Sequence, residues 1–497
     1  MGKNYAISAG NPVTLEAAEL ILDSGGNAVD AAIAAYLACF VAEPCMASAG
    51  AGGFAMVGTA SETYCIDFFC QTPVHKRPAA ELDFYPVTID FGTAQEDFHI
   101  GRGAAATPGA VAGIFAMHER WATMPMSELS QPALTAAKQG AKIDAFQAYD
   151  IDLLSEIFLT NEYGQQLFAP SGELLTDGDS ILMPAFADFL HVLCAEGPDL
   201  FYKGEVAKSI VLDQAANGGS LQYEDFLNYE AKISHPLSVE WADHIVQTTP
   251  TPSVGGALIV AFLHEYLQVQ QSLPTPLSRD HYDRLVRCYD RVNRIKDDDR
   301  LIAQYLYETF GISIPATNSA AKWNGTSHFN VVDDTGMAVG LTTSIGEGCG
   351  YFIPGTDMQL NNMLGEAALL PKGFHSWVPN TRLRSMMTPT IVRNSEGHIV
   401  TVTGSGGAGR IPFAIAQTII NHILHNLPIH EAVNMDRIHK HNGMINVEPR
   451  YQVEAAPHIT KWDKQSLYFG GVHSIARSGT TLEAAGDLRR HGVSVSH

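Results

Sequence analysis

Positively charged residues are scarce in this chain. Its 497 residues include 31 Lys and Arg against 53 Asp and Glu, which gives a formal net charge of −22. Nucleic acids and anionic membrane surfaces are bound through clusters of Lys and Arg. The one basic stretch, His75-Lys76-Arg77, is too short for that role. The composition therefore argues against a nucleic-acid or membrane partner.

Long apolar runs are also missing. The longest, residues 31–42, is shorter than the roughly 20 residues that span a bilayer, and the N-terminus lacks the apolar stretch of a signal peptide. Seven scattered cysteines contain no CxxC motif. An odd number without metal-like spacing indicates reduced thiols, so we expect a cytoplasmic protein.

No low-complexity linker or internal repeat divides the sequence, and 46% hydrophobic with 17% charged residues is typical of a globular protein. Hydrophobic periodicity predicts helices over 16–22, 28–41, 110–121, 131–140, 184–195, 205–215, 279–309 and 411–424. It predicts strands over 54–57, 64–68, 245–248, 327–332, 337–343, 390–392 and 398–403. This order fits strands covered by helices on both outer faces.

A glycine-rich loop, Gly404–Gly409, matches GxGxxG between a predicted strand and a predicted helix. A dinucleotide site would need an acidic residue at the end of a second parallel strand, but Glu431 lies where another helix begins. A phosphate-binding Walker A loop is excluded because Arg410-Ile411 replaces its Lys-Ser/Thr. Two interpretations are favoured over the dinucleotide site: a tight strand-to-helix turn, or an oxyanion hole of backbone N–H groups.

The segment Asn324–Asp333, NGTSHFNVVD, resembles the processing site of the γ-glutamyltranspeptidase family of N-terminal nucleophile hydrolases. Further family-like motifs recur in family order along nearly the whole chain: residues 25–32, 43–44, 52–54, 107–109, 201–204, 252–256, 299–300, 360–362, 387–390 and 404–410. The resemblance implies an α/β fold, the four-layer αββα sandwich of N-terminal nucleophile hydrolases.

Thr326 is the nucleophile that this resemblance implies, although by pattern alone it would be an ordinary strand residue. A threonine hydroxyl needs an adjacent base. Cleavage between Gly325 and Thr326 would supply an α-amine, whose ordinary pKa is about 7.7–8.0. In the precursor the same hydroxyl would attack the Gly325 carbonyl, and the resulting ester would hydrolyse. Residues 1–325 and 326–497 would then be a large and a small subunit of one structural unit.

The resemblance also assigns supporting roles. Ser344, where family members usually have Thr, would hydrogen-bond the nucleophile, and Gly407 and Ala408 fall where the oxyanion donors lie. We expect no cofactor and no metal, because the pair His439 and His441 lacks the carboxylate or cysteine ligands of a metal site. We expect those two histidines, and His328, to be structural.

The substrate site differs from the family pattern, in which a polar clamp holds the α-carboxylate and α-amine of a γ-glutamyl group. The positions concerned are Phe69, Gly346, Met363, Glu366, Ser385 and Met386. Phe69 replaces an Arg, Gly346 an Asn, Met363 a Gln and Met386 a Ser, whereas Glu366 matches the amine-binding Asp and Ser385 is kept. Losing the Arg removes a bidentate contact to a carboxylate. We therefore expect a less polar acyl pocket, unless Arg384 or Arg102 supplies a relocated charge.

The sequence thus predicts a self-processing enzyme that transfers or hydrolyses the acyl group of a small amide, γ-glutamyl or other, with water or an amine as acceptor. The two segments would stay associated as a heterodimer, and a higher oligomer is left open. One alternative is a hydrolase for another amide, such as an acyl side chain, an oxamate-like amide or a polymer. Another is an uncleaved, non-catalytic relative.

Overall fold

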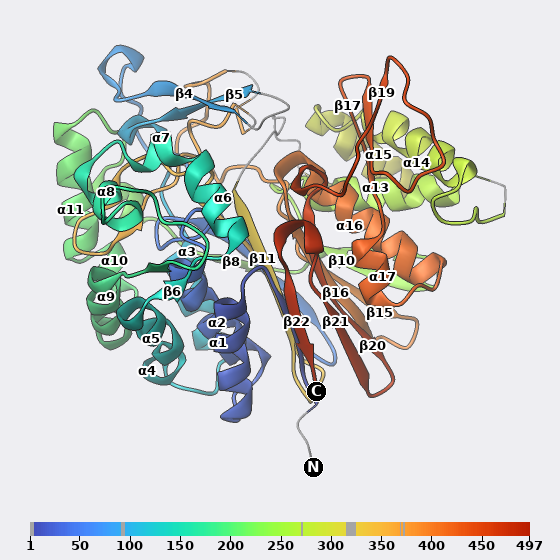
Figure 1. Ribbon diagram of the computed structural model, residues 1–497, viewed down its shortest axis with the longest axis horizontal. Helices are drawn as coiled ribbons and strands as arrows, with labels where there is room; N and C mark the ends of the chain where they lie inside the picture. The colour runs from blue at the N-terminus through green and yellow to red at the C-terminus, as the bar shows by residue number, and fades with distance from the viewer. Residues whose placement is uncertain (1–3, 91–94, 270–271, 315–324, 368, 371–372) are drawn as a thin grey trace.

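Two β-sheets lie face to face at the centre of the computed structural model, and helices cover the outer face of each (Figure 1). The structure describes residues 4–90, 95–269, 272–314, 325–367, 369–370 and 373–497. The order of layers is helix, sheet, sheet, helix. The predicted αββα sandwich is therefore confirmed.

The first sheet has seven strands in the order β22 (Val493–Ser496), β1 (Ala6–Ala9), β11 (Thr326–Val332), β12 (Ala338–Ser344), β2 (Gly52–Gly58), β3 (Thr63–Phe68) and β8 (Lys232–Ser234). The second has the order β21 (Thr481–Ala485), β20 (Gly471–Ser478), β16 (Ile399–Gly406), β15 (Thr390–Asn394), β10 (His244–Thr248) and β9 (Leu237–Trp241). Strand β16, which precedes the glycine-rich loop, is antiparallel to both neighbours. A dinucleotide fold needs a parallel sheet at this point, so the GxGxxG match does not mark such a site.

One helical layer, left of the sheets in Figure 1, contains α1 (Pro12–Asp23), α2 (Ala28–Ala42), α3 (Ala110–Trp121), α4 (Met126–Leu129), α5 (Gln131–Gln139), α6 (Ala145–Leu153), α7 (Ser155–Phe158), α8 (Glu162–Phe168), α9 (Pro184–Glu196), α10 (Asp199–Tyr202), α11 (Glu205–Ala216) and α12 (Tyr223–Leu227). The other contains α13 (Gly255–Leu267), α14 (Arg279–Val292), α15 (Asp299–Phe310), α16 (Ile411–Ile419) and α17 (Ile429–Asn434). Smaller elements are the hairpins β4 (Tyr85–Asp90) with β5 (Gln95–Ile100), β6 (Ala141–Lys142) with β7 (Ser180–Ile181) and β13 (Phe352–Ile353) with β14 (Met358–Gln359), and the sheet of β17 (Ile438–His441), β18 (Met444–Val447) and β19 (Ile459–Lys461).

The prediction of one helix over 279–309 is wrong. Helix α14 ends at Val292, and α15 starts afresh at Asp299. The side chain of Asp298 accepts a hydrogen bond from the backbone N–H of Arg300 and so caps the second helix. Within the described ranges, no helix is long and apolar enough to cross a membrane.

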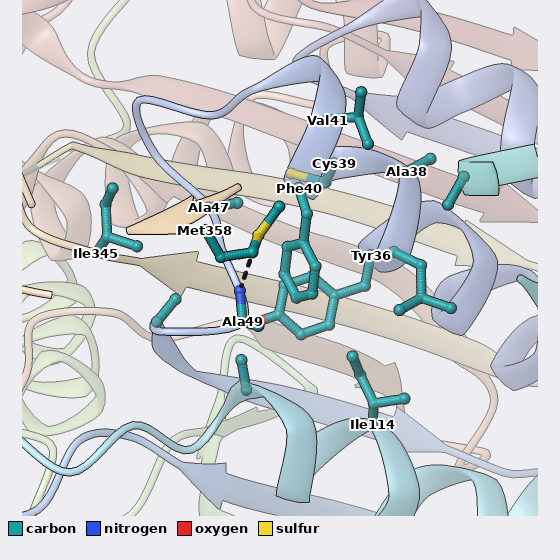
Figure 2. Packing of buried hydrophobic residues seen from close by; sticks show 14 of the residues in the cluster. Tyr36, Ala38, Cys39, Phe40, Val41, Ala47, Ala49, Ile114, Ile345 and Met358 are labelled. Carbon is teal, nitrogen blue, oxygen red and sulfur yellow. Dashed lines mark hydrogen bonds between the residues drawn. The ribbon is translucent and has the colours of Figure 1, made fainter. Parts of the chain in front are cut away.

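Helix α2 is buried along all fifteen of its residues, as its apolar sequence predicts. Its N-terminus is fixed by a capping box between Asn27 and Asp30. Figure 2 shows Tyr36 and Phe40 packed beside Ala49, whose backbone N–H donates to the sulfur of Met358 at 3.4 Å. The helix therefore anchors the loop that follows it, and this loop reaches the candidate active site.

Candidate active site

Thr326 is the first residue of β11, a strand inside the seven-stranded sheet. It lies opposite Ser344 on β12, and Ser344 lies opposite Gly52 on β2. Thr326 is only 2% exposed. The predicted hairpin of β11 and β12 thus places the proposed nucleophile and its predicted partner side by side across the ladder.

Gly325, the residue before Thr326, is hydrogen-bonded through both its carbonyl oxygen and its N–H. The hydroxyl of Ser344 donates to the carbonyl oxygen of Gly325 at 2.5 Å and accepts from the N–H of Gly346 at 2.9 Å. The N–H of Gly325 donates to the carboxylate of Glu347. The carbonyl that self-cleavage would attack is therefore fixed and polarised.

The glycine-rich loop meets the start of β11 from the opposite sheet. A Cβ on Gly406 would lie 2.4 Å from the carbonyl oxygen of Thr326, so only glycine permits this approach. Gly407 and Ala408 follow with φ of 113° and 53°, and a 3-10 helix then spans Ala408–Arg410. The loop backbone therefore packs directly against Thr326 at Gly406, and the turn at Gly407 and Ala408 follows immediately.

Two buried carboxyl groups, those of Glu347 and Glu366, lie near Gly325 and Gly346. Gly346 has φ 68°, and a Cβ there would lie 2.0 Å from Oδ1 of Asn362 and 2.9 Å from Oε1 of Glu366. The N–H of Glu347 donates to the same Asn362 oxygen at 3.1 Å. Burial raises the pKa of Glu347 to about 7, whereas burial and the charge of Glu347 raise that of Glu366 well above its usual range. The charged form of Glu347 therefore favours the protonated form of Glu366.

Three of the other substrate positions are buried apolar side chains. Gly52 lies against residues 69 and 70, since a Cβ on it would meet the backbone N of Cys70 at 2.7 Å. Phe69 is 1% exposed and stacks on Phe54 with ring centroids 5.6 Å apart. Met363 and Met386 belong to the same buried apolar cluster as Phe69.

Ser385 is hydrogen-bonded to the residues at the start of helix α13. Its carbonyl accepts hydrogen bonds from the hydroxyl of Ser253 at 2.9 Å and from the N–H of Val254 at 3.0 Å. Its own hydroxyl accepts from the N–H of Met387 at 3.0 Å. These bonds fix the segment that carries Met386.

Both candidate relocated charges are already paired. Arg384 contacts Asp299 at 2.7 Å, and Arg102 contacts Asp213 at 2.6 Å and Asp83 at 3.3 Å. Each guanidinium therefore has a protein carboxylate as its partner.

A small cavity beside Gly325 brings this residue together with others that sequence analysis missed. It measures about 40 Å³, and its lining includes Cys45, Asp150, Gly325, Glu347 and Arg490. Arg490 donates to the carbonyl oxygen of Thr326 at 3.1 Å. Asp150 and Arg490 stand in no recognisable local motif, so only the fold reveals them.

Two of the three histidines that the sequence analysis considers, His328 and His439, are buried. The two nitrogens of His328 lie 2.8 Å from the Thr342 hydroxyl and 3.0 Å from Oδ1 of Asn330, and burial lowers the pKa of His328 to about 3. Burial also holds the pKa of His439 well below its usual range. Both rings are thus neutral at physiological pH.

Comparison with known families agrees with this geometry. A family model described as Gamma-glutamyltranspeptidase matches residues 14–289 and 287–496. This chain belongs to the gamma-glutamyltranspeptidase family. The predicted family and the predicted class, an amidohydrolase or acyltransferase of the N-terminal nucleophile type, are therefore confirmed, and the non-catalytic alternative loses its support.

Relatives in this family span nearly the whole chain. The glutathione hydrolase proenzyme of Bacillus subtilis (strain 168) is 28% identical, over 100% of this chain and 92% of its own length. The Acylase ACY 1 proenzyme of Pseudomonas sp. (strain V22) is 27% identical, over 100% and 94%. The cephalosporin acylase from Bacillus halodurans has the same fold, with a TM-score of 0.84 and 22% identity over 99% of this chain and 96% of that one.

Proposed function

We propose that this protein cleaves itself between Gly325 and Thr326 and then uses Thr326 as the nucleophile of an amide hydrolase or acyltransferase. The observation that carries the proposal is the hydrogen bond from Ser344 to the Gly325 carbonyl, the group that Thr326 must attack. Relatives named proenzymes support it.

In the proposed self-cleavage, the hydroxyl oxygen of Thr326 adds to the Gly325 carbonyl carbon. Negative charge develops on the carbonyl oxygen, which already accepts a hydrogen bond from Ser344. The C–N bond then breaks, and water hydrolyses the ester. After cleavage, the α-amine of Thr326 serves as base for its own hydroxyl, and the N–H groups of Gly407 and Ala408 stabilise the oxyanion of the substrate.

The two segments would remain together as a heterodimer. Strands β11 and β12 belong to residues 326–497, yet they lie between β1 and β2 of residues 1–325. Cleavage at Gly325 leaves those ladders intact, so neither segment can leave without breaking the sheet.

The proposed substrate is a small amide whose acyl group is less polar than γ-glutamyl. The buried apolar side chains of Phe69, Met363 and Met386 support this choice, because a buried carboxylate without a cationic partner is costly. The acyl acceptor is water or an amine. All seven cysteines are free thiols, which suits the cytoplasmic location that remains a prediction.

Gel electrophoresis and intact mass test the proposal. The purified wild-type protein should give one fragment ending at Gly325 and one beginning at Thr326, and Thr326→Ala should remain a single chain. A wild-type chain that stays whole after long incubation, or a Thr326→Ala chain that is cut, would refute Thr326 as the agent of cleavage.

A further inference from the structure

Self-cleavage needs a base that the mature enzyme does not. Before cleavage, the nitrogen of Thr326 belongs to an amide and cannot accept the hydroxyl proton, so the proton must go elsewhere. Ser344 directs its hydroxyl to the Gly325 carbonyl. The ring of His328 is engaged by Thr342 and Asn330. A different acceptor is therefore required.

The cavity beside Gly325 contains suitable groups. Its volume of about 40 Å³ exceeds the roughly 10–15 Å³ that one water needs, and its lining offers several polar partners. Two carboxyl groups, Glu347 and Asp150, border this space together with the guanidinium of Arg490. A water held there would contact both the scissile residue and a carboxylate.

Glu347 is the better placed of the two carboxyl groups. Its carboxylate accepts the N–H of Gly325 and therefore touches the residue that is cut. Asp150 is instead coupled to the charge of Arg490, and it also faces the charges of Asp144 and Glu43. Arg490 in turn binds the carbonyl oxygen on the far side of Thr326.

We propose that the Glu347 carboxylate is the general base of self-cleavage and acts on the Thr326 hydroxyl through water in this cavity. This inference rests on the proposed role of Thr326 as nucleophile. It gives Glu347 a part in a step that precedes substrate binding.

Each proton in the step has a destination. The Thr326 hydroxyl passes its proton through water to Glu347 as the oxygen–carbon bond forms at Gly325. Protonated Glu347 returns the proton to the Thr326 nitrogen as the C–N bond breaks, which leaves an ester and an amine. A second water then attacks the ester carbonyl and gives its proton to Glu347, and the departing Thr326 oxygen takes that proton back. The net reaction consumes one water and yields the Gly325 carboxyl group and the Thr326 α-amine.

The surroundings of Glu347 suit this role. Burial and the charge of Glu96 raise its pKa, hydrogen bonds from Glu366, Gly325 and Asn362 oppose the rise, and the net result is a pKa of about 7. A base works best when its pKa lies near the working pH. Because Glu347 and Glu366 interact closely, the apparent pKa belongs to the pair. The base form increases as the pH rises, so self-cleavage should accelerate between about pH 5 and 8 and then level off.

The test follows self-cleavage of purified full-length precursor over time at several pH values. Glu347→Gln should slow cleavage by about 10²–10⁴-fold and abolish the rise near pH 7. Asp150→Asn, the matched control from the same cavity, should keep that rise. If Glu347→Gln does not fold, as judged by its thermal unfolding, Glu347→Asp should cleave slowly with the pH dependence retained.

Three results would overturn the inference: a wild-type rate without a rise near pH 7, a Glu347→Gln rate within about threefold of wild type, or loss of the rise in Asp150→Asn instead. The experiment distinguishes failure of this inference from failure of the proposed function. Cleavage of Thr326→Ala would refute the proposed function, whereas normal cleavage of Glu347→Gln with an intact Thr326→Ala chain would refute only the role of Glu347.

Discussion

Ser344 donates its hydroxyl proton to the carbonyl oxygen of Gly325 across a 2.5 Å hydrogen bond. Family resemblance predicts a bond from Ser344 to the nucleophile, but in the uncut chain the hydroxyl meets the carbonyl of the preceding residue. Ser344 can take these two roles one after the other, because cleavage would separate the Gly325 carbonyl from Thr326 and leave Ser344 opposite Thr326.

Ser344→Ala should slow self-cleavage by about 10²–10³-fold, the usual effect of removing one donor to an oxyanion. Ser344→Thr keeps the hydroxyl and should cleave within about tenfold of wild type. The fraction of cut chain over time, measured on a gel, gives both rates. Equal rates for the alanine variant and the wild type would show that the bond is only structural.

Gly346→Ala should destabilise the protein and suppress cleavage. The added Cβ would lie 2.0 Å from Asn362, at a backbone φ of 68° that side chains rarely adopt. We expect a loss of about 1–3 kcal/mol from the backbone conformation and a further loss from the clash. Gly355→Ala is the matched control, since its φ is 73° and nothing lies within 4 Å of the added atom. Equal thermal unfolding midpoints for the two variants would contradict the close packing at Gly346.

A γ-glutamyl amide should be a poor donor for the cleaved enzyme. Its α-carboxylate would lose water beside Phe69 and gain no guanidinium there, because Arg384 and Arg102 are paired with Asp299, Asp213 and Asp83. Each lost charge-assisted hydrogen bond costs about 1.5–3 kcal/mol, so kcat/KM should fall at least about a hundredfold below that of an apolar acyl anilide.

The control for this donor prediction is Arg102→Gln, which should leave the ratio of the two kcat/KM values unchanged. Selective loss of γ-glutamyl turnover in that variant would show that the carboxylate site has moved to Arg102. Equal efficiency of the wild type on both anilides would contradict the apolar pocket itself.

Asp487→Asn should lower the free energy of unfolding by about 3–5 kcal/mol, because it leaves the buried Arg437 without its carboxylate and removes one of the two carboxylates that pair with Arg489. Asp487 contacts Arg437 at 2.7 Å and Arg489 at 3.1 Å. Burial alone would raise the pKa of Asp487, but these arginines hold it well below its usual range. A depressed folded-state pKa stabilises the protein above the unfolded value of about 3.9, and this contribution disappears as the pH falls.

Denaturant unfolding at pH 7 and pH 3, in the Thr326→Ala background so that the chain is single, measures this effect. The difference in unfolding free energy between this background and the same chain with Asp487→Asn added should narrow at the lower pH. Exposed Asp334→Asn, the control, should change stability by less than about 0.5 kcal/mol. A constant difference at both pH values would contradict the depressed pKa.

Local signals allowed the sequence to predict much of the site. The turn Asp333–Gly336 between two apolar strands predicted the β11–β12 hairpin, and this hairpin sets Ser344 opposite Thr326. The apolar run of α2 predicted its burial. Each signal lies within a few residues of the structure that it specifies.

Long-range neighbours could not be predicted in this way. Asp150, Glu347 and Arg490 border one cavity although they are far apart along the chain. The neutralisation of Arg384 by Asp299 likewise depends on how α15 packs. The break between α14 and α15 was missed because charged residues continue a helical pattern through a segment that Asp298 caps.

Strands β11 and β12 lie between β1 and β2. A molecule cut between Gly325 and Thr326 would therefore refold less readily than the single chain. As a single chain, the protein brings these strands together by an intramolecular search. After cleavage, two separate chains would have to associate and pair these four strands in one sheet. Their refolding would therefore depend on protein concentration. The Gly325–Thr326 peptide bond that restrains the proposed nucleophile would therefore also be the bond that keeps folding intramolecular, and a cut molecule that unfolds would lack it.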